Sequence, residues 1–143
     1  MSRLQFRSIF VSDVHLGTRD CRADYLLDFL DSTQSQYLYL VGDIFDLWGM
    51  RRSVHWTAEH SAVVQRILDK AREGTRVIYV PGNHDEMCRE FAGSDFQGVA
   101  VRLNATHTTA DGRRFFVSHG DEFDGVVKHS PMLRQIGDRA YYA

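Results

Sequence analysis

Four short apolar stretches of the sequence are each followed at once by a cluster of acidic, histidine or amide residues. The four clusters are Ser12-Asp13-Val14-His15, Gly42-Asp43-Ile44-Phe45-Asp46, Gly82-Asn83-His84-Asp85 and Ser118-His119-Gly120-Asp121. Short apolar runs that end in polar turn residues are typical of buried strands. A fold compatible with this sequence therefore has to accept a polar cluster at the end of each of these strands.

The stretches between these clusters predict an alternation of strands and helices. We expect strands over 8–11, 37–41, 75–80 and 115–117, with one or two more between 99 and 109. Apolar residues at helical spacing predict helices from Cys21 to about Leu30 and from Val54 to about Arg72, and a short helix over 86–91. This order favours βαβ units in an α/β layered fold. Ligands bind at the carboxyl ends of strands in such folds, so we expect all four clusters at one edge of one sheet.

Length and composition remove several classes of protein. The 143 residues suit one domain, and 43% of them are apolar, which is enough for a core. Two cysteines without a C-x-x-C pair exclude a four-thiolate zinc site and fit the cytoplasm. A net charge of −2 gives no basic surface for nucleic acid, and no apolar run is long enough to cross a membrane. We therefore expect a cytoplasmic protein without a nucleic-acid partner.

The residue types in the clusters point to divalent metal ions. Carboxylate, imidazole and amide ligands without thiolates favour Mn²⁺, Fe²⁺, Zn²⁺ or Mg²⁺. A carboxylate has two oxygens and can bridge two cations about 3.5–4 Å apart, as in two-metal phosphoryl-transfer sites. Each cluster alone has a plainer explanation, such as a helix cap, a turn or a half-buried histidine. All four in order, each at a predicted strand end, favour the metal site.

The clusters resemble the motifs of the calcineurin-like metallophosphoesterases, D-x-H, G-D-x-x-D, G-N-H-[DE] and a later histidine beside glycine. The resemblance implies a layered α/β/β/α sandwich, of which this chain would hold the N-terminal part. It implies two divalent metal ions, Mn²⁺ before the others, and a metal-dependent hydrolase. By the same resemblance, Asp13 and His15 bind the first metal and Asp43 bridges both. Asn83 and His119 bind the second, His84 protonates the leaving oxygen, and Asp46 orients His84.

Three longer segments are similar to the UDP-2,3-diacylglucosamine pyrophosphatase group. They are Ser12-Asp13-Val14-His15-Leu16-Gly17, Val41-Gly42-Asp43-Ile44-Phe45-Asp46-Leu47-Trp48 and His119-Gly120-Asp121-Glu122-Phe123-Asp124. The resemblance implies hydrolysis of a phosphoanhydride in a nucleotide-linked glycolipid of lipid A assembly, at the periphery of the inner membrane. The best-known members carry arginine where this chain has His84, which indicates a sister group.

The last block of the family, G-H-x-H, does not follow His119 in this sequence. By resemblance it gives one ligand to each metal. Three interpretations remain open: a shortened single domain over 1–143, a partner chain that supplies the block, or a minimal site with fewer protein ligands. We favour the first, in which a helical cap begins at about 123–143 and leaves an exposed face for self-association. The alternative functions are an inactive metal-binding fragment of the same fold and a phosphodiesterase with another substrate.

Overall fold

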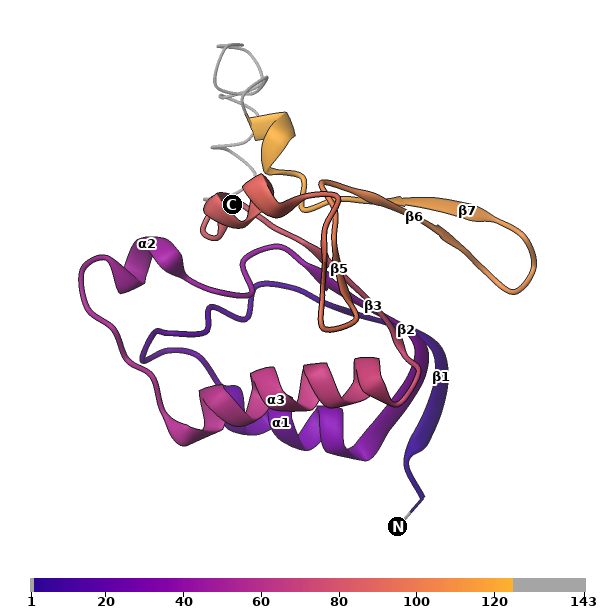
Figure 1. Cartoon of the computed structure of the whole chain (residues 1–143), viewed down its shortest axis with the longest axis horizontal. Coiled ribbons are helices and arrows are strands. Elements are labelled where there is room, and N and C mark those ends of the chain that lie inside the picture. The colour runs from indigo at the N-terminus through magenta and orange to yellow at the C-terminus, as the bar shows by residue number, and fades with distance from the viewer. Residues whose placement is uncertain (1, 125–143) are drawn as a thin grey trace, which may run out of the picture.

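The computed structural model describes residues 2–124, in which strands and helices alternate as far as β3 (Figure 1). The strands are β1 (Leu4–Val11), β2 (Thr33–Val41), β3 (Arg76–Val80), β4 (Asp95–Phe96), β5 (Val99–Val101), β6 (Ala105–Thr108) and β7 (Arg114–Val117). The helices are α1 (Ala23–Ser32), α2 (Leu47–Met50), α3 (Ala58–Arg72) and the 3-10 helix η1 (Glu86–Phe91). The cap expected at about 123–143, and with it the face expected for self-association, lies outside the described residues except for 123 and 124.

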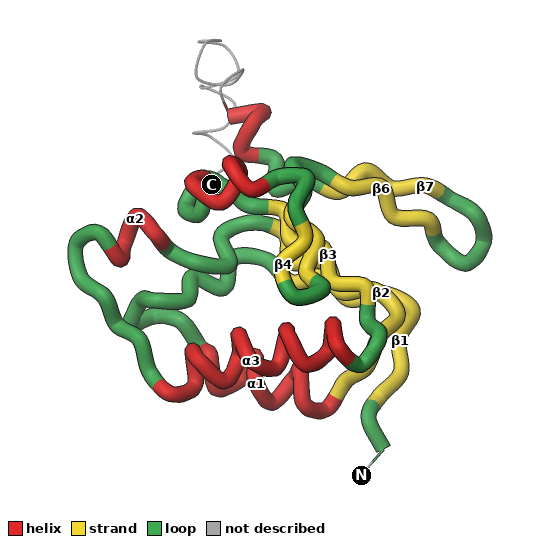
Figure 2. The backbone as a smooth tube through the Cα atoms, viewed as in Figure 1, coloured by secondary structure: helices red, strands yellow, loops and turns green. Residues whose placement is uncertain are grey.

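A five-stranded sheet in the order β1-β2-β3-β5-β4 forms the centre of the fold (Figure 2). β1, β2, β3 and β5 run parallel, and only β4 runs antiparallel to its neighbour. Parallel neighbours need a crossover between them, which α1 and α3 provide for the first two pairs. This arrangement confirms the α/β class expected from the sequence.

Helices α1 and α3 lie together on one face of the sheet (Figure 1). Alternate strand residues point toward them, and Ile9, Leu38 and Val77 join Val63 and Ile67 of α3 in the buried core. Burial of such aliphatic side chains stabilises the fold by roughly 1.5–3 kcal/mol each. Among the described residues, no helix combines the length and the apolar character needed to cross a membrane.

The opposite face of the sheet carries aromatic residues and meets the two-stranded sheet of β6 and β7. Tyr39 stacks on Phe10 with ring centroids 4.7 Å apart, and its hydroxyl lies 3.0 Å from Nδ1 of the buried His107 in β6. β7 pairs with β6 alone, in the register Ala105 opposite Val117. The expectation that all four clusters follow strands of one sheet was therefore wrong for β7. The tight turn at 109–113 instead pairs β7 with β6, the strand that directly precedes it in the chain.

Several element boundaries differ from the expected ones for local reasons. The helix expected from Val54 begins at Ala58, because the Thr57 hydroxyl accepts a hydrogen bond from the N–H of His60 and caps it. The helix expected from Cys21 begins at Ala23. β2 begins four residues before Tyr37, because the polar segment 33–36 pairs with β1 although its hydropathy does not suggest a strand. The short helix α2 was not expected.

Candidate metal centre

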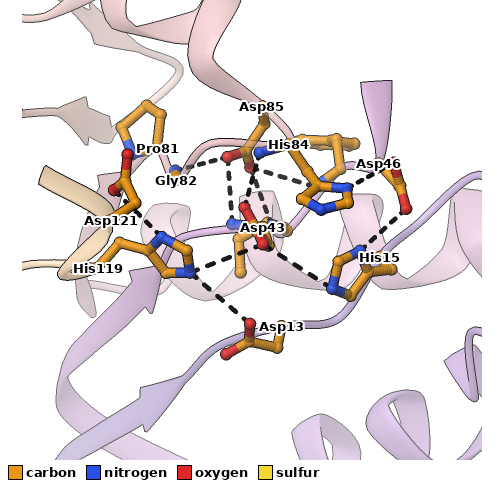
Figure 3. A network of polar contacts seen from close by, with 12 residues as sticks. Asp13, His15, Asp43, Asp46, Pro81, Gly82, His84, Asp85, His119 and Asp121 are labelled. Atoms are coloured by element: carbon orange, nitrogen blue, oxygen red, sulfur yellow. Dashed lines mark hydrogen bonds and ion pairs between the residues drawn. The ribbon is translucent and has the colours of Figure 1, made fainter. Parts of the chain in front are cut away.

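Three loops converge at the carboxyl ends of β1, β2 and β3 (Figure 3). Their backbones are joined directly: the N–H of Asp13 donates to the carbonyl of Gly42 at 3.1 Å, and the N–H of Gly42 donates to that of Val80 at 2.7 Å. The N–H of His15 donates to the carbonyl of Asp43 at 2.9 Å. The sheet thus continues as a network of loop hydrogen bonds that sets the relative positions of three of the four clusters.

Unusual backbone angles concentrate in these loops. Among the described residues, four that are not glycine have positive φ, and three of them are Asp13 (53°), His15 (56°) and Asp43 (53°). The left-handed region costs such residues roughly 1–2 kcal/mol, so the surrounding structure has to enforce it. Strained residues of this kind cluster at functional sites.

The buried carboxylate of Asp43 lies between two histidines. Its Oδ2 is 3.9 Å from Nε2 of His15 and 3.7 Å from Nε2 of His119. On the far side, Nε2 of His119 is 3.6 Å from Oδ1 of Asp13. We call His15, Asp43 and His84 the His15 group, and Asp13, Asp43 and His119 the His119 group. The ligand atoms within each group lie within 4.8 Å of one another. Two groups that share one carboxylate match the donor set of a two-cation site.

Asp46 holds both histidines of the His15 group. Its Oδ2 lies 3.0 Å from Nδ1 of His15, and its Oδ1 lies 2.9 Å from Nδ1 of His84. Burial favours a higher pKa for the Asp46 carboxyl, but hydrogen bonds from His84, the N–H of Gly49 and His15 lower it. Burial favours a lower pKa for His84, but the hydrogen bond and charge of Asp46 raise it. The ring of Trp48 lies against that of His84, with centroids 4.6 Å apart.

Asp121 holds His119 from the other side. One of its oxygens lies 3.2 Å from Nδ1 of His119, and both accept from the guanidinium of Arg89, at 2.7 and 2.8 Å. Arg89 also donates to the carbonyl of Pro81 at 3.3 Å, which connects this pair to the loop after β3. Burial favours a higher pKa for Asp121, but Arg89 and His119 lower it. A carboxylate on Nδ1 turns the Nε2 atom of an imidazole toward a metal position.

Two glycines leave room for the ring of His119. A Cβ at Gly42 would lie 2.1 Å from Cδ2 of His119, and φ at Gly42 is +73°. A Cβ at Gly82 would lie 2.4 Å from Oδ1 of Asp43 and 2.7 Å from Nδ1 of His119. These contacts explain why both motifs need glycine beside the acidic or amide residue.

The structure brings together six of the seven residues singled out from the sequence: Asp13, His15, Asp43, Asp46, His84 and His119. The seventh, Asn83, is half-buried in the same loop as His84. His84 lies among the potential ligands of the His15 group, a position that the sequence pattern did not indicate. Sequence reasoning also missed Arg89, which no motif marks.

Comparisons with known proteins place the chain in a family. The family model of the calcineurin-like phosphoesterases matches residues 6–141. The UDP-2,3-diacylglucosamine hydrolase of Porphyromonas gingivalis is 28% identical over 129 residues, which cover 85% of this chain and 48% of that protein. The enzyme of the same name from Neisseria gonorrhoeae is 30% identical over 121 residues, or 80% of this chain and 48% of the relative.

Among solved structures, the Pseudomonas putida nuclease MPE matches with a TM-score of 0.40 and 21% identity, over 66% of this chain and 46% of that one. The chain spans about half the length of the curated relatives it matches. The family model, in contrast, extends over nearly all of the sequence. The chain belongs to the calcineurin-like phosphoesterase family.

Proposed function

We propose that this chain carries the metal-binding core of a hydrolase that cleaves a phosphoanhydride bond, in UDP-2,3-diacylglucosamine or a similar nucleotide-linked substrate. The observation that carries the proposal is the position of Asp43, whose Oδ2 lies between Nε2 of His15 and Nε2 of His119. The substrate is suggested by the names of the curated relatives. A glycolipid of this kind also fits the expected position near a membrane surface.

The donors fit divalent cations. Both groups offer only carboxylate oxygens and imidazole nitrogens, a set that suits divalent cations such as Mn²⁺, Zn²⁺, Fe²⁺ or Mg²⁺. The family resemblance places Mn²⁺ first among them. Asn83 would add an amide oxygen on the side of His119. When bound, two such cations neutralise the charge of a phosphate and lower the pKa of water.

His84 is proposed as the group that gives a proton to the leaving oxygen. Asp46 accepts from its Nδ1, which leaves Nε2 free to face a substrate. Asp46 also raises the pKa of His84, so a larger fraction of the imidazole carries the proton near neutral pH. The position of His84 beside His15 and Asp43 supports a second role, as a third ligand of the first cation.

Metal counting and ³¹P NMR test this proposal on the 143-residue chain. We expect two equivalents of Mn²⁺ per chain and release of uridine monophosphate from UDP-2,3-diacylglucosamine. His84→Ala should keep both cations and lose about 100-fold or more in turnover if His84 is the acid, since general acids contribute roughly 10²–10⁴-fold. Loss of one cation from His84→Ala would instead make it a ligand. His55→Ala, outside both groups, is the matched control and should behave like the wild type.

A metal-binding module without turnover is the second candidate function. Each group of the described residues offers three Asp or His side chains, and Asp13 is exposed over 59% of its side chain. Two cations bound without release of phosphate from any nucleotide-linked substrate would favour this candidate. No bound cation at all would contradict both candidates.

A further inference from the structure

The carboxylate of Asp85 is fully buried and belongs to neither metal-ligand group. It belongs to the third polar cluster of the sequence, but its oxygens face backbone N–H groups (Figure 3). Within the described part of the chain Asp85 forms no ion pair with a basic side chain. Because a buried carboxylate without partners is very costly, these neutral donors have to satisfy it.

Five donors surround this carboxylate. Oδ1 accepts from the N–H of Gly82 at 2.6 Å and from that of Asp43 at 3.1 Å. Oδ2 accepts from the N–H groups of Ile44 and Phe45, at 2.9 and 3.2 Å. The fifth donor is the buried hydroxyl of Tyr79 in β3, at 2.5 Å from Oδ2. Three consecutive N–H groups of the loop after β2 therefore converge on one side chain of the loop after β3.

The hydrogen bonds between these two loops run in both directions. Asp85 accepts from the N–H of Asp43, and Oδ1 of Asp43 accepts from the N–H of His84 at 2.9 Å. With Oδ1 engaged in this way, Oδ2 of Asp43 is the oxygen that faces His15 and His119. These reciprocal hydrogen bonds restrain the backbone of Asp43, whose φ of 53° is costly for a residue other than glycine.

We infer that Asp85, which accepts a hydrogen bond from the hydroxyl of Tyr79, is the positioning residue that fixes the carboxylate of Asp43. Asp85 thereby sets the affinity for the cations. Asp85 does so without touching a cation, through the backbone of residues 43–45. The inference rests on the proposed metal site and names the part of the fold that builds it. Partners of metal ligands change affinity by roughly 10–100-fold when they are removed.

Asp85→Asn tests the inference, because it keeps the shape of the side chain and replaces one acceptor oxygen by an NH₂ group. That group has to face either the Gly82 and Asp43 amides or the Ile44, Phe45 and Tyr79 donors. We expect amide hydrogen exchange in the metal-free chain to accelerate about tenfold or more, either at Gly82 and Asp43 or at Ile44 and Phe45, because hydrogen bonds to a charged group are lost there. We expect the Kd for Mn²⁺ to rise about tenfold or more.

Tyr79→Phe is the milder variant and removes only one donor. It should shift both measurements in the same direction by a smaller factor, about threefold. Thr75→Val is the matched control, because the buried Thr75 hydroxyl also donates a hydrogen bond, to the carbonyl of Ser35 at 2.9 Å. Thr75 directly precedes β3, whereas the candidate site lies at the carboxyl end of this strand. It should lower the melting temperature and leave Mn²⁺ affinity and exchange at residues 43–45 unchanged.

The possible outcomes separate this inference from the proposed function. A folded Asp85→Asn chain with wild-type exchange and wild-type Mn²⁺ affinity overturns the inference and leaves the proposed function intact. If Asp85→Asn does not fold, Tyr79→Phe decides, since unchanged affinity in that variant overturns the inference. If the wild type binds no Mn²⁺, the proposed function fails, and amide exchange in the metal-free chain alone decides on Asp85.

Discussion

The two halves of the candidate metal centre are assembled in different ways. The His15 group comes from loops that follow three neighbouring strands of one sheet, and the single carboxylate of Asp46 holds both of its histidines. The His119 group draws its histidine from the end of β7, which belongs to the second sheet. His119 is kept in place by Asp121, Arg89 and a close fit against Gly42. The first half is therefore set by sheet topology, and the second by contacts between sheets.

Asp43→Ala should have the largest effect, because it removes the carboxylate that both halves share. We expect bound Mn²⁺ to fall from two equivalents to none. Loss of a residue that only supports a metal ligand lowers affinity by roughly 10–100-fold, so loss of this ligand should lower it about 100-fold or more at each position. Calorimetric titration measures this loss. Asp111→Ala, in the exposed turn before β7, is the control. One cation retained at wild-type affinity would mean that the two halves do not depend on a common ligand.

Gly42→Ala should break the His119 half alone. The new methyl group would overlap the ring of His119, so we expect one equivalent of Mn²⁺ in place of two. Gly112→Ala is a matched control, because φ there is +87° and a Cβ would meet nothing within 4 Å. Both variants lose roughly 1–2 kcal/mol of stability from the backbone, and only the first should lose a cation. Two cations in Gly42→Ala would show that the fit of His119 is not needed for binding.

Asp121→Asn should weaken the His119 half without abolishing it. The amide no longer forms an ion pair with Arg89 and holds Nδ1 of His119 less firmly, so we expect the second Mn²⁺ to bind about tenfold more weakly. Asp95→Asn removes an exposed ion pair with Arg102, at 3.3 Å, and should change nothing measurable. Equal weakening of both cations in Asp121→Asn would contradict the separation of the halves.

Asp46→Asn should produce the smallest of these effects, a shift in the pKa of His84 in the metal-free chain. Asp46 raises this pKa above the ordinary value of 6.5, so its neutralisation should lower it. The raised pKa contributes stability below pH 6.5, and that contribution is lost as the pH rises through the folded-state pKa. As the pH rises from 6.5 through the folded-state pKa of His84, Asp46→Asn should therefore lose less stability than the wild type does. Histidine NMR titration checks the shift, with Asp28→Asn, on the exposed face of α1, as control.

The sequence was sufficient to predict most of the strands and helices and to single out six side chains that the structure places close together. Apolar runs that end in polar clusters identified β1, β2, β3 and β7. The order of the motifs also predicted that His119 lies near Asp13, and the two are 3.6 Å apart although β7 belongs to another sheet. The pairing of segment 33–36 with β1 was beyond reach, because its polar residues carry no strand signal. Pairing between distant segments decides such cases.

The supporting contacts of the site were predictable only in part. The spacing of Asp46 and His84 in the sequence gives no distance between them. The family resemblance suggested their contact, and Oδ1 of Asp46 lies 2.9 Å from Nδ1 of His84. The contact of Asp46 with His15 depends on how the loops after β1 and β2 meet, which no spacing in the sequence reveals. Arg89 and Tyr79 lie outside the clusters, so no pattern connects them with His119 or Asp85. A side chain that acts through another side chain or through the backbone is not marked by a characteristic spacing in the sequence.

The left-handed backbone of the ligand residues implies a trade-off between function and robustness. At Asp13, with φ 53°, glycine would relieve the backbone, whereas alanine would retain the strain. We therefore expect Asp13→Gly to be more stable than Asp13→Ala by about 1 kcal/mol, as denaturant midpoints would report, although both lose the same ligand. Selection for thermostability without selection for metal binding would drive such a position toward glycine. If Asp13 binds a cation as proposed, the aspartate at this position costs the fold stability that glycine would restore.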